Sequence, residues 1–167
     1  MKFKIELGDI TVYKVAAIVN AANTSLLGVG GVDGDIHRAA GHQLLEECKK
    51  IGGCKTGTAV ITKGYNLKAA YVIHTAGPVF DGNLEKSSPL LASCYRQSLK
   101  LALKHNLKTI AFPSISAGAY RFPLKEAAKT ALKTIKEFSD SDLEITMVCF
   151  SNDAKAAYEH AAKEKFK

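Results

Sequence analysis

The sequence predicts an α/β fold in which helices cover both faces of a mostly parallel sheet. Short apolar or alternating segments, typical of strands, take turns with longer segments whose apolar residues recur every three or four positions, as in amphipathic helices. The chain has 167 residues, 47% of them hydrophobic and 23% charged, a composition that is ordinary for a globular protein. No linker-like stretch or internal repeat divides the chain, so we expect one domain over residues 1–167.

Six segments are expected to be strands because they are short and are either apolar throughout or alternate in polarity. In chain order they are Phe3–Leu7, Ala16–Ala22, Ala59–Thr62, Tyr71–Thr75, Thr109–Pro113 and Leu143–Phe150. Four other segments have a helical period, and they run over Asp33–Lys50, from Ser88 to about His105, over Pro123–Phe138 and from Asn152 through Lys163. Ser88 and Asn152 are the expected N-caps of the second and fourth helices, and Pro89 is expected at a first helical position.

The charge indicates an anionic partner. The 23 lysines and arginines exceed the 16 aspartates and glutamates and give a net charge of +7. Such an excess is typical of proteins that meet nucleic acid, a membrane surface or a phosphorylated ligand. No apolar run approaches the length of a membrane span. The N-terminal segment Met1–Asp9 meets an acidic residue before a signal peptide could form its apolar core, so we expect a cytoplasmic protein without a transmembrane helix.

The cysteines favour a reducing compartment. No two of the four form a Cys-x-x-Cys pair, and a chain of this size needs no disulfide, so we expect buried or half-buried thiols. A zinc site built from His42, Cys48 and Cys54 is an alternative, although no paired-ligand spacing supports it.

Two loops at the carboxyl ends of expected strands stand out, because ligands of α/β sheets bind there. Residues 20–34 contain four glycines within seven positions, so the backbone N–H groups can approach an anion at the start of a helix. Residues 113–123 combine small residues and hydroxyls with Tyr120, and they form a second candidate anion nest. Neither a Rossmann nor a Walker A fingerprint fits, since Asp33 occupies the third glycine position and no Gly-Lys dipeptide occurs. The alternative is that the glycines only form a tight turn.

Polar side chains near these loops are the other candidates. Asn20 and Asn23 bracket the end of a buried strand, where their amides need partners such as the hydroxyls of a sugar. Asp33 at the start of a helix is either a functional carboxylate or a complement to the helix dipole. Asp9 follows the first strand within Gly8-Asp9-Ile10-Thr11, where an Asx turn is the simpler expectation.

In order along the chain, these segments resemble a macrodomain. The matching stretches are Gly8-Asp9-Ile10-Thr11, Ile18-Val19-Asn20-Ala21-Ala22-Asn23, Gly30-Gly31-Val32-Asp33-Gly34, Ile36-His37-Arg38-Ala39-Ala40-Gly41, Thr56-Gly57-Thr58-Ala59, Tyr71-Val72-Ile73-His74-Thr75-Ala76-Gly77-Pro78 and Pro113-Ser114-Ile115-Ser116-Ala117-Gly118. The similarity runs from about residue 8 to residue 160, and the Val-Asp-Gly segment with the following His is most similar to the MacroD-type hydrolase branch.

The resemblance implies a three-layer α/β/α sandwich with a mixed, mostly parallel six-stranded central sheet, and an ADP-ribose cleft above it. It also implies a hydrolase that removes ADP-ribose from acidic side chains and deacetylates O-acetyl-ADP-ribose, without a metal or a cofactor. ADP-ribosylated proteins would then be its partners, nucleic acid would not be the main one, and a monomer is expected.

The resemblance also implies roles for single residues. Asp33 would position or deprotonate the attacking water, and Asn23 would orient the distal ribose. Asp9 and Ile10 would contact adenine, with Phe150 packed on the ring and Asn152 nearby. The other implied ligand-binding residues lie in or beside the two loops: Asn20, Gly30, Gly31, Val32, Ser114, Ser116, Ala117, Gly118, Ala119 and Tyr120.

Three positions depart from the family pattern. Val29 interrupts the glycine run, Asp35 replaces a small residue, and Arg121 stands where a glycine is usual. Two other functions stay open: a reader of ADP-ribosylated proteins or poly-ADP-ribose without chemistry, and an RNA-binding protein, which only the net charge suggests. His74 is expected to have a core role, although the chain contains the residue types for a Ser116–His74–Asp33 catalytic triad.

Overall fold

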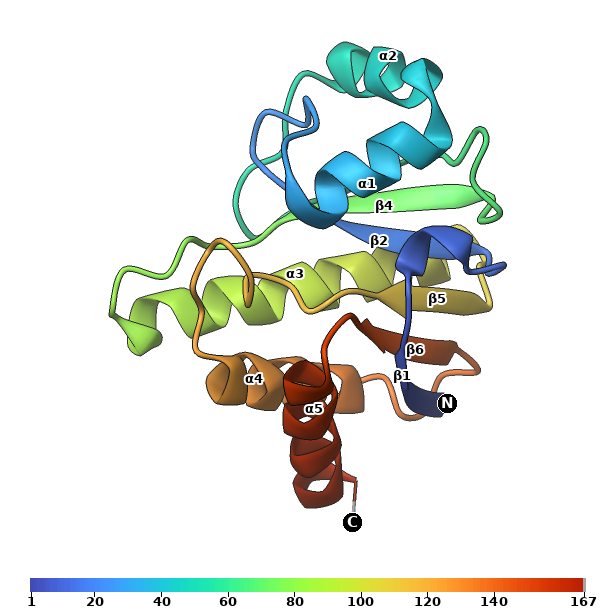
Figure 1. The fold of residues 1–167 in the computed structure, drawn as a ribbon. Coiled ribbons are helices and arrows are strands. Elements are labelled where there is room, and N and C mark those ends of the chain that lie inside the picture. Colours follow the sequence, from blue (N-terminus) through green and yellow to red (C-terminus); the bar gives the residue numbers. More distant parts are fainter. Residues whose placement is uncertain (167) are drawn as a thin grey trace.

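The computed structural model describes residues 1–166, and these residues form a six-stranded sheet between two layers of helices (Figure 1). The strands are β1 (Lys2–Leu7), β2 (Ala17–Ala22), β3 (Ala59–Lys63), β4 (Tyr71–Ala76), β5 (Thr109–Phe112) and β6 (Glu144–Cys149). The α-helices are α1 (Gly31–Ala40), α2 (His42–Ile51), α3 (Leu84–Lys104), α4 (Leu124–Lys136) and α5 (Asn152–Lys165), and a short 3₁₀ helix η1 covers Ile10–Val12.

The sheet is mixed but mostly parallel. Its strand order is β1-β6-β5-β2-β4-β3. Neighbouring strands from β1 to β4 are parallel, whereas β3 pairs antiparallel with β4 at the edge. The predicted three-layer α/β/α sandwich with a mixed six-stranded sheet is therefore confirmed.

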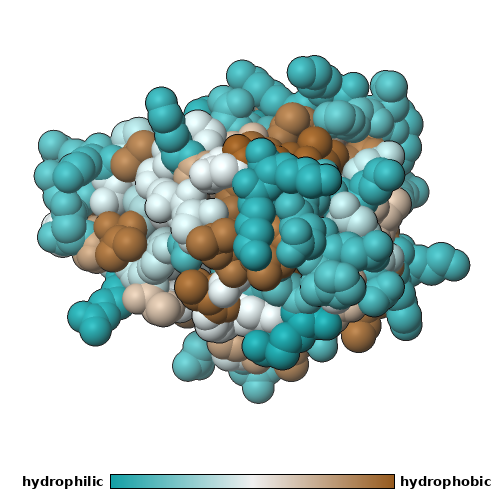
Figure 2. Space-filling view, turned by 90° about the horizontal axis from the view of Figure 1, so that it is seen from above, coloured by the Kyte–Doolittle hydropathy of each residue, from teal (hydrophilic) through white to brown (hydrophobic). Residues whose placement is uncertain are grey.

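Helices cover both faces of the sheet, as the apolar character of the central strands requires. Helices α1 and α2 lie on one face, and α3, α4 and α5 lie on the other (Figure 1). Strand β2 shows the alternation: Ile18 and Ala22 belong to the core under α1 and α2, whereas Ala17 and Val19 belong to the larger core on the opposite side. Viewed from the α2 side, hydrophilic side chains occupy most of the rim, and apolar side chains gather between them (Figure 2).

The expected helix Asp33–Lys50 is in fact two helices. Gly41 has φ of +90°, a value that favours glycine, and its N–H closes α1 on the carbonyl of His37. The N–H of Leu44 then donates to the Gly41 carbonyl and starts α2. The prediction of one helix was wrong because apolar residues keep the helical spacing across the break.

Two predicted N-caps were also wrong. Helix α3 begins before Ser88: Asn83 is its N-cap, and the Asn83 side chain accepts a hydrogen bond from the Lys86 N–H at 3.2 Å. Pro89 lies inside this helix near its exposed beginning, where the carbonyl left without a partner can bind water. At α5, Ser151 is the cap and accepts from the Ala154 N–H, while Asn152 is the first helical residue.

All four cysteines are buried and free, which confirms the expectation of buried thiols. Among residues 1–166, no helix combines the length and apolar character that a membrane crossing requires.

Candidate functional site

The two candidate loops lie side by side because the strands before them are neighbours. The glycine loop comprises residues 23–30, between β2 and α1, and the serine loop comprises residues 113–123, between β5 and α4. Because β2 and β5 are parallel and adjacent, both loops leave the same edge of the sheet (Figure 1). Strands β1 and β6 end at that edge as well. The topology thus brings together the ligand-binding segments implied by the sequence.

Asp33 is the buried acid of this region. It is the third residue of α1 and is 2% exposed. Its Oδ1 accepts a hydrogen bond from Nδ2 of Asn20 at 2.7 Å, and its Oδ2 accepts from the N–H of Val29 at 2.9 Å. His37, one turn further along α1, places Nε2 3.5 Å from the same Oδ1. Asp33 therefore joins strand β2, the glycine loop and helix α1 at a single carboxylate.

Asn20 faces the interior of the protein. Besides its bond to Asp33, Asn20 Nδ2 lies 3.1 Å from Nδ1 of His74 on the neighbouring strand. Among the described residues, Oδ1 of Asn20 has no hydrogen-bond partner. The sequence predicted that a ligand would satisfy this amide, but its nitrogen already bonds two residues of the chain.

His74 is fully buried, as expected for a core residue. Burial, with a smaller contribution from His37, lowers its pKa to about 3, so the ring is neutral at physiological pH. Its Nε2 lies 2.9 Å from Oγ1 of Thr62 and 3.9 Å from Sγ of Cys48. Ser116 Oγ has no partner within residues 1–166, so the structure does not assemble a Ser116–His74–Asp33 triad.

The half-buried Asn23 uses one end of its amide to shape the glycine loop. Its Oδ1 accepts hydrogen bonds from Oγ of Ser25 at 2.7 Å and from the N–H of Leu26 at 3.1 Å. The Nδ2 group is left to donate to another partner. Further along the loop, Gly28 has φ of +75°, and a Cβ there would lie 3.0 Å from the His37 ring, so a side chain would be strained and crowded.

The serine loop is closed by its own backbone. The Phe122 N–H donates to the Ser116 carbonyl, and the Arg121 N–H donates to the Gly118 carbonyl, both at 2.9 Å. Within the described part of the chain, no residue accepts a hydrogen bond from the N–H groups of residues 117–119. These amides suit an anion, whereas the Ser114 hydroxyl is 2.6 Å from the Tyr158 hydroxyl and serves to join the loop to α5.

An acid and an exposed aromatic ring meet where β1 and β6 end. The Gly8 N–H donates to the Cys149 carbonyl at 2.9 Å, which places Asp9 beside Phe150 in the fold. Phe150 is 78% exposed, which is unusual for an aromatic side chain. Oδ1 of Asp9 accepts from the N–H and the hydroxyl of Thr11, so the expected Asx turn is present and Oδ2 stays available. Ile10 is buried behind Asp9, and Asn152 is exposed at the start of α5.

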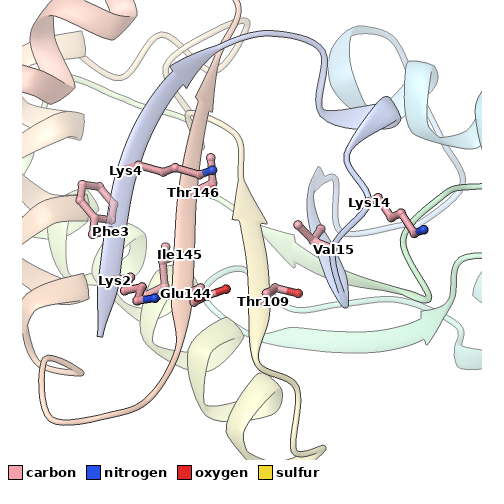
Figure 3. A pocket seen from close by; sticks show the side chains of 9 residues that line it. All are labelled: Lys2, Phe3, Lys4, Lys14, Val15, Thr109, Glu144, Ile145 and Thr146. Atoms are coloured by element: carbon pink, nitrogen blue, oxygen red, sulfur yellow. Dashed lines mark ion pairs between the residues drawn. The ribbon is translucent and has the colours of Figure 1, made fainter.

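Two hollows differ in their surroundings. One of about 380 Å³ lies behind the glycine loop and is lined by Gly30 and His37 among others. The other, of about 480 Å³, lies at the amino ends of the strands and is lined by Lys2, Lys4 and Lys14 (Figure 3). The lysines of the second hollow lie away from the predicted site residues.

Nothing in residues 1–166 groups three or more His, Cys, Asp or Glu side chains as a metal site would. His42 is exposed on α2, whereas Cys48 and Cys54 are buried, so the three residues of the zinc alternative are not brought together.

The parallel sheet, its antiparallel edge strand and the loops above the strand ends define the macrodomain architecture, and solved structures agree. A mutant of the Oceanobacillus iheyensis macrodomain with ADPR superposes with a TM-score of 0.92 at 41% identity, over 96% of this chain and 91% of that one. The Trypanosoma brucei macrodomain in complex with ADP-ribose gives 0.89 at 43% identity, over 95% and 68%.

Sequence comparisons identify the family. The Macro domain model matches residues 19–131. A Macro domain-containing protein of Chlorobaculum tepidum is 56% identical over 92% of this chain and 91% of its own length. ADP-ribose glycohydrolase MACROD2 of Xenopus laevis is 59% identical over 78% of this chain and 32% of its own length. The chain belongs to the macro domain family.

Proposed function

We propose that this protein binds ADP-ribose and hydrolyses mono-ADP-ribosyl esters on Asp and Glu side chains, as well as O-acetyl-ADP-ribose, as a MacroD-type enzyme. The observation that carries the proposal is the buried Asp33 carboxylate, which hydrogen bonds hold at both oxygens. The neighbouring serine loop offers the N–H groups of residues 117–119, which have no acceptor among the described residues. Relatives named ADP-ribose glycohydrolase and neighbours solved with ADP-ribose support it.

The nucleotide would lie along the strand ends. Oδ2 of Asp9 would accept a hydrogen bond from the adenine amino group, the adjacent Ile10 N–H would donate to the base, and Phe150 would pack against the ring. The diphosphate would then lie between the first turn of α1 and the N–H groups of residues 117–119, which offer hydrogen bonds without a lysine or an arginine. Asn23 would donate its Nδ2 to the distal ribose.

The chemistry would use a water molecule next to Asp33. The carboxylate would orient the water and accept one of its protons as the water oxygen attacks the carbonyl carbon of the ester. The ester C–O bond would then break, and the proton would pass from Asp33 to the leaving ribose oxygen. The products are a carboxylic acid and a free ribose hydroxyl. Since the hydrogen bonds from Asn20 and Val29 fix the carboxylate before substrate arrives, little reorganisation is needed during the reaction.

A reader without chemistry is the second candidate. Both oxygens of Asp33 already have partners, an arrangement that an anchor at a helix N-terminus would share. Turnover separates the two functions, because both predict that ADP-ribose binds.

The test measures ADP-ribose binding by calorimetry and hydrolysis of both substrates. We expect Asp33→Asn to lower kcat by about 10²–10⁴-fold, the usual contribution of a general base, with a much smaller change in the Kd of ADP-ribose. Asn23→Ala should also lower kcat. Asp35→Asn is the matched control, because Asp35 is an exposed carboxylate on the same helix that pairs with Arg38.

The outcomes are distinct. Hydrolysis by Asp33→Asn at the parental rate would show that Asp33 is not the acting carboxylate. Tight binding of ADP-ribose by the parent protein without turnover of either substrate would instead identify a reader.

A further inference from the structure

Four side chains form a continuous buried chain that leads inward from Asp33. Asp33 on α1 bonds Asn20 on β2, Asn20 bonds His74 on β4, and His74 bonds Thr62 on the edge strand β3. Each of the four is at most 2% exposed. Asn20 and His74 are direct register partners across β2 and β4, so the sheet itself sets their separation.

The hydrogens in this chain can have only one arrangement. A carboxylate only accepts, so the Asn20 atom 2.7 Å from Asp33 Oδ1 must be the amide nitrogen. That nitrogen also lies 3.1 Å from Nδ1 of His74, so Nδ1 must accept and carries no hydrogen. The hydrogen of the neutral ring is then on Nε2 and is donated to Thr62 Oγ1 at 2.9 Å. The Thr62 hydroxyl in turn donates to the Lys63 carbonyl at 3.1 Å.

We propose that His74 and Thr62 are positioning residues for Asp33. Thr62 accepts the Nε2 hydrogen that this tautomer of His74 carries, and His74 in turn holds the Asn20 amide with its nitrogen toward the Asp33 carboxylate. This inference rests on the proposed function, in which Asp33 acts on the water. It assigns a role in catalysis to an edge-strand threonine that is two side chains removed from the carboxylate.

The opposite tautomer of His74, with its hydrogen on Nδ1, would disturb the contact between Asn20 and Asp33. A hydrogen on Nδ1 of His74 would point at the Asn20 NH₂ group, and two donors would oppose each other. Turning the amide would relieve that conflict but would place Oδ1 of Asn20 against the Asp33 carboxylate, where two acceptors repel. If the amide turns, Asp33 loses its 2.7 Å hydrogen bond from Asn20, and only the Val29 N–H still holds the carboxylate.

Neighbouring groups cannot replace Thr62. Cys48 Sγ also lies near Nε2 of His74, but at 3.9 Å, and a thiol sulfur is a weak acceptor. His37 faces the pair from α1 with its ring centroid 6.3 Å from that of His74, too far for a hydrogen bond. The threonine hydroxyl, whose own hydrogen is donated to the Lys63 carbonyl, is therefore the acceptor that stabilises the Nε2–H tautomer.

The test removes only the hydroxyl. Thr62→Val keeps the size of the side chain but not the acceptor, whereas Thr62→Ser keeps the acceptor. Thr134→Val is the stability control, because Thr134 is equally buried, at 2% exposed, in the distant helix α4. The readouts are the ¹⁵N shifts of the His74 ring, the Kd of ADP-ribose, and kcat with O-acetyl-ADP-ribose.

We expect the parent protein and Thr62→Ser to hold His74 as the Nε2–H tautomer. Thr62→Val should populate the Nδ1–H form and lower kcat roughly 10-fold, as for the loss of one ordered buried hydrogen bond, with an unchanged Kd for ADP-ribose. Thr134→Val should match the parent protein in all three readouts.

Two results would overturn the proposal. One is an Nδ1–H or doubly protonated His74 in the parent protein at neutral pH, and the other is a Thr62→Val variant with parental ring shifts and parental kcat. If the parent protein hydrolyses neither substrate, the proposed function fails, and the ring shifts still decide whether Thr62 stabilises the Nε2–H tautomer.

Discussion

The glycine loop and the serine loop occupy equivalent places in the fold but are held in different ways. Each follows a parallel strand and leads into a helix, α1 on one face of the sheet and α4 on the other. The glycine loop is anchored by side chains, mainly the Asp33 carboxylate on the Val29 N–H and the Asn23 amide on the Leu26 N–H. The serine loop is closed by backbone bonds such as that from Phe122 to Ser116. A loop held by side chains can be retuned by one substitution or by protonation, whereas a loop held by backbone bonds presents its amides whatever side chains it carries.

The largest expected effect is a loss of stability on substitution of Gly34. A Cβ there would lie 2.5 Å from the Val29 carbonyl oxygen, so Gly34→Ala must displace the backbone at Val29. The N–H of the same residue donates to Asp33, so this hydrogen bond is disturbed as well. We expect a loss of up to about 3 kcal/mol in the free energy of unfolding, measured by urea denaturation, as for other overpacked sites.

Gly30→Ser is the matched control for stability. Nothing lies within 4 Å of a Cβ at Gly30, and serine is a favourable residue at this N-cap. If Gly34→Ala were as stable as Gly30→Ser, the glycine loop would not be closely fitted against α1.

Acid should act mainly on the side-chain network behind the glycine loop. Because burial lowers the pKa of His74 from 6.5 to about 3, the unfolded chain takes up a proton on this ring at a higher pH than the folded protein does. This contribution to stability is complete above about pH 6.5 and is lost as the pH falls toward about 3.

Between about pH 6.5 and pH 5, His74 should therefore remove about 2 kcal/mol from the free energy of unfolding. His74→Gln should show a shallower loss over the same range in urea denaturation. Parallel curves for the two proteins would mean that His74 is protonated equally in the folded and unfolded states.

A smaller effect is expected in the serine loop at Arg121. Arg121 has φ of +62°, a conformation that costs a side-chain-bearing residue free energy. Arg121→Gly relieves this backbone strain, but glycine also gives the unfolded chain more conformational freedom, which lowers stability. The net effect should be an increase of about 0.5 kcal/mol in the free energy of unfolding.

Arg121→Ala removes the same charge and keeps the Cβ, so it should show no gain in stability. Equal thermal midpoints for the glycine and alanine variants would contradict a strained backbone at this position.

The smallest expected effect is that of salt concentration on the Kd of ADP-ribose. Residues 20–33 contain no lysine or arginine, and residues 114–122 contain only Arg121, so backbone amides would bind the diphosphate. The Kd of ADP-ribose should change by less than about threefold between about 0.05 and 0.5 M NaCl, because fixed amide dipoles at short range are screened weakly. A steep increase of Kd with salt would instead indicate that lysines provide the binding.

The order of strands and helices could be predicted because periodicity is a local property. The break at Gly41 could not, since Leu44 and Cys48 continue the apolar spacing of α1 beyond it. The start of α3 was placed late because Ser88-Pro89 is a typical helix start, whereas the cap at Asn83 is one short side chain in a polar stretch. Local signals compete at such places, and tertiary packing decides between them.

The polar residues of the candidate site were visible in the sequence, but their connections were not. Asn20 and His74 stood out as polar side chains within apolar strands, while Thr62 passed as an ordinary strand residue. Only the register of β3, β4 and β2 shows that these three side chains meet. The functional roles of the site residues stay predictions that the variants above test.

The net charge of +7 does not concentrate at the proposed cleft. Lysines instead line the hollow at the amino ends of the strands, on β1 and before β2. Charge that first indicated an anionic ligand therefore lies mostly away from the place where the ligand would be bound.

The burial of Cys48 makes the reactivity of its thiol a measure of how often α2 opens. Burial, helped by the negative charges of Asp33 and Glu47, raises the pKa of this thiol to about 11, so at neutral pH it is both covered and protonated. A thiol reagent can reach it only when α2 lifts from the sheet, so the labelling rate counts those excursions. Because Cys48 neighbours His74, the same rate reports how often water enters the polar network beneath the glycine loop.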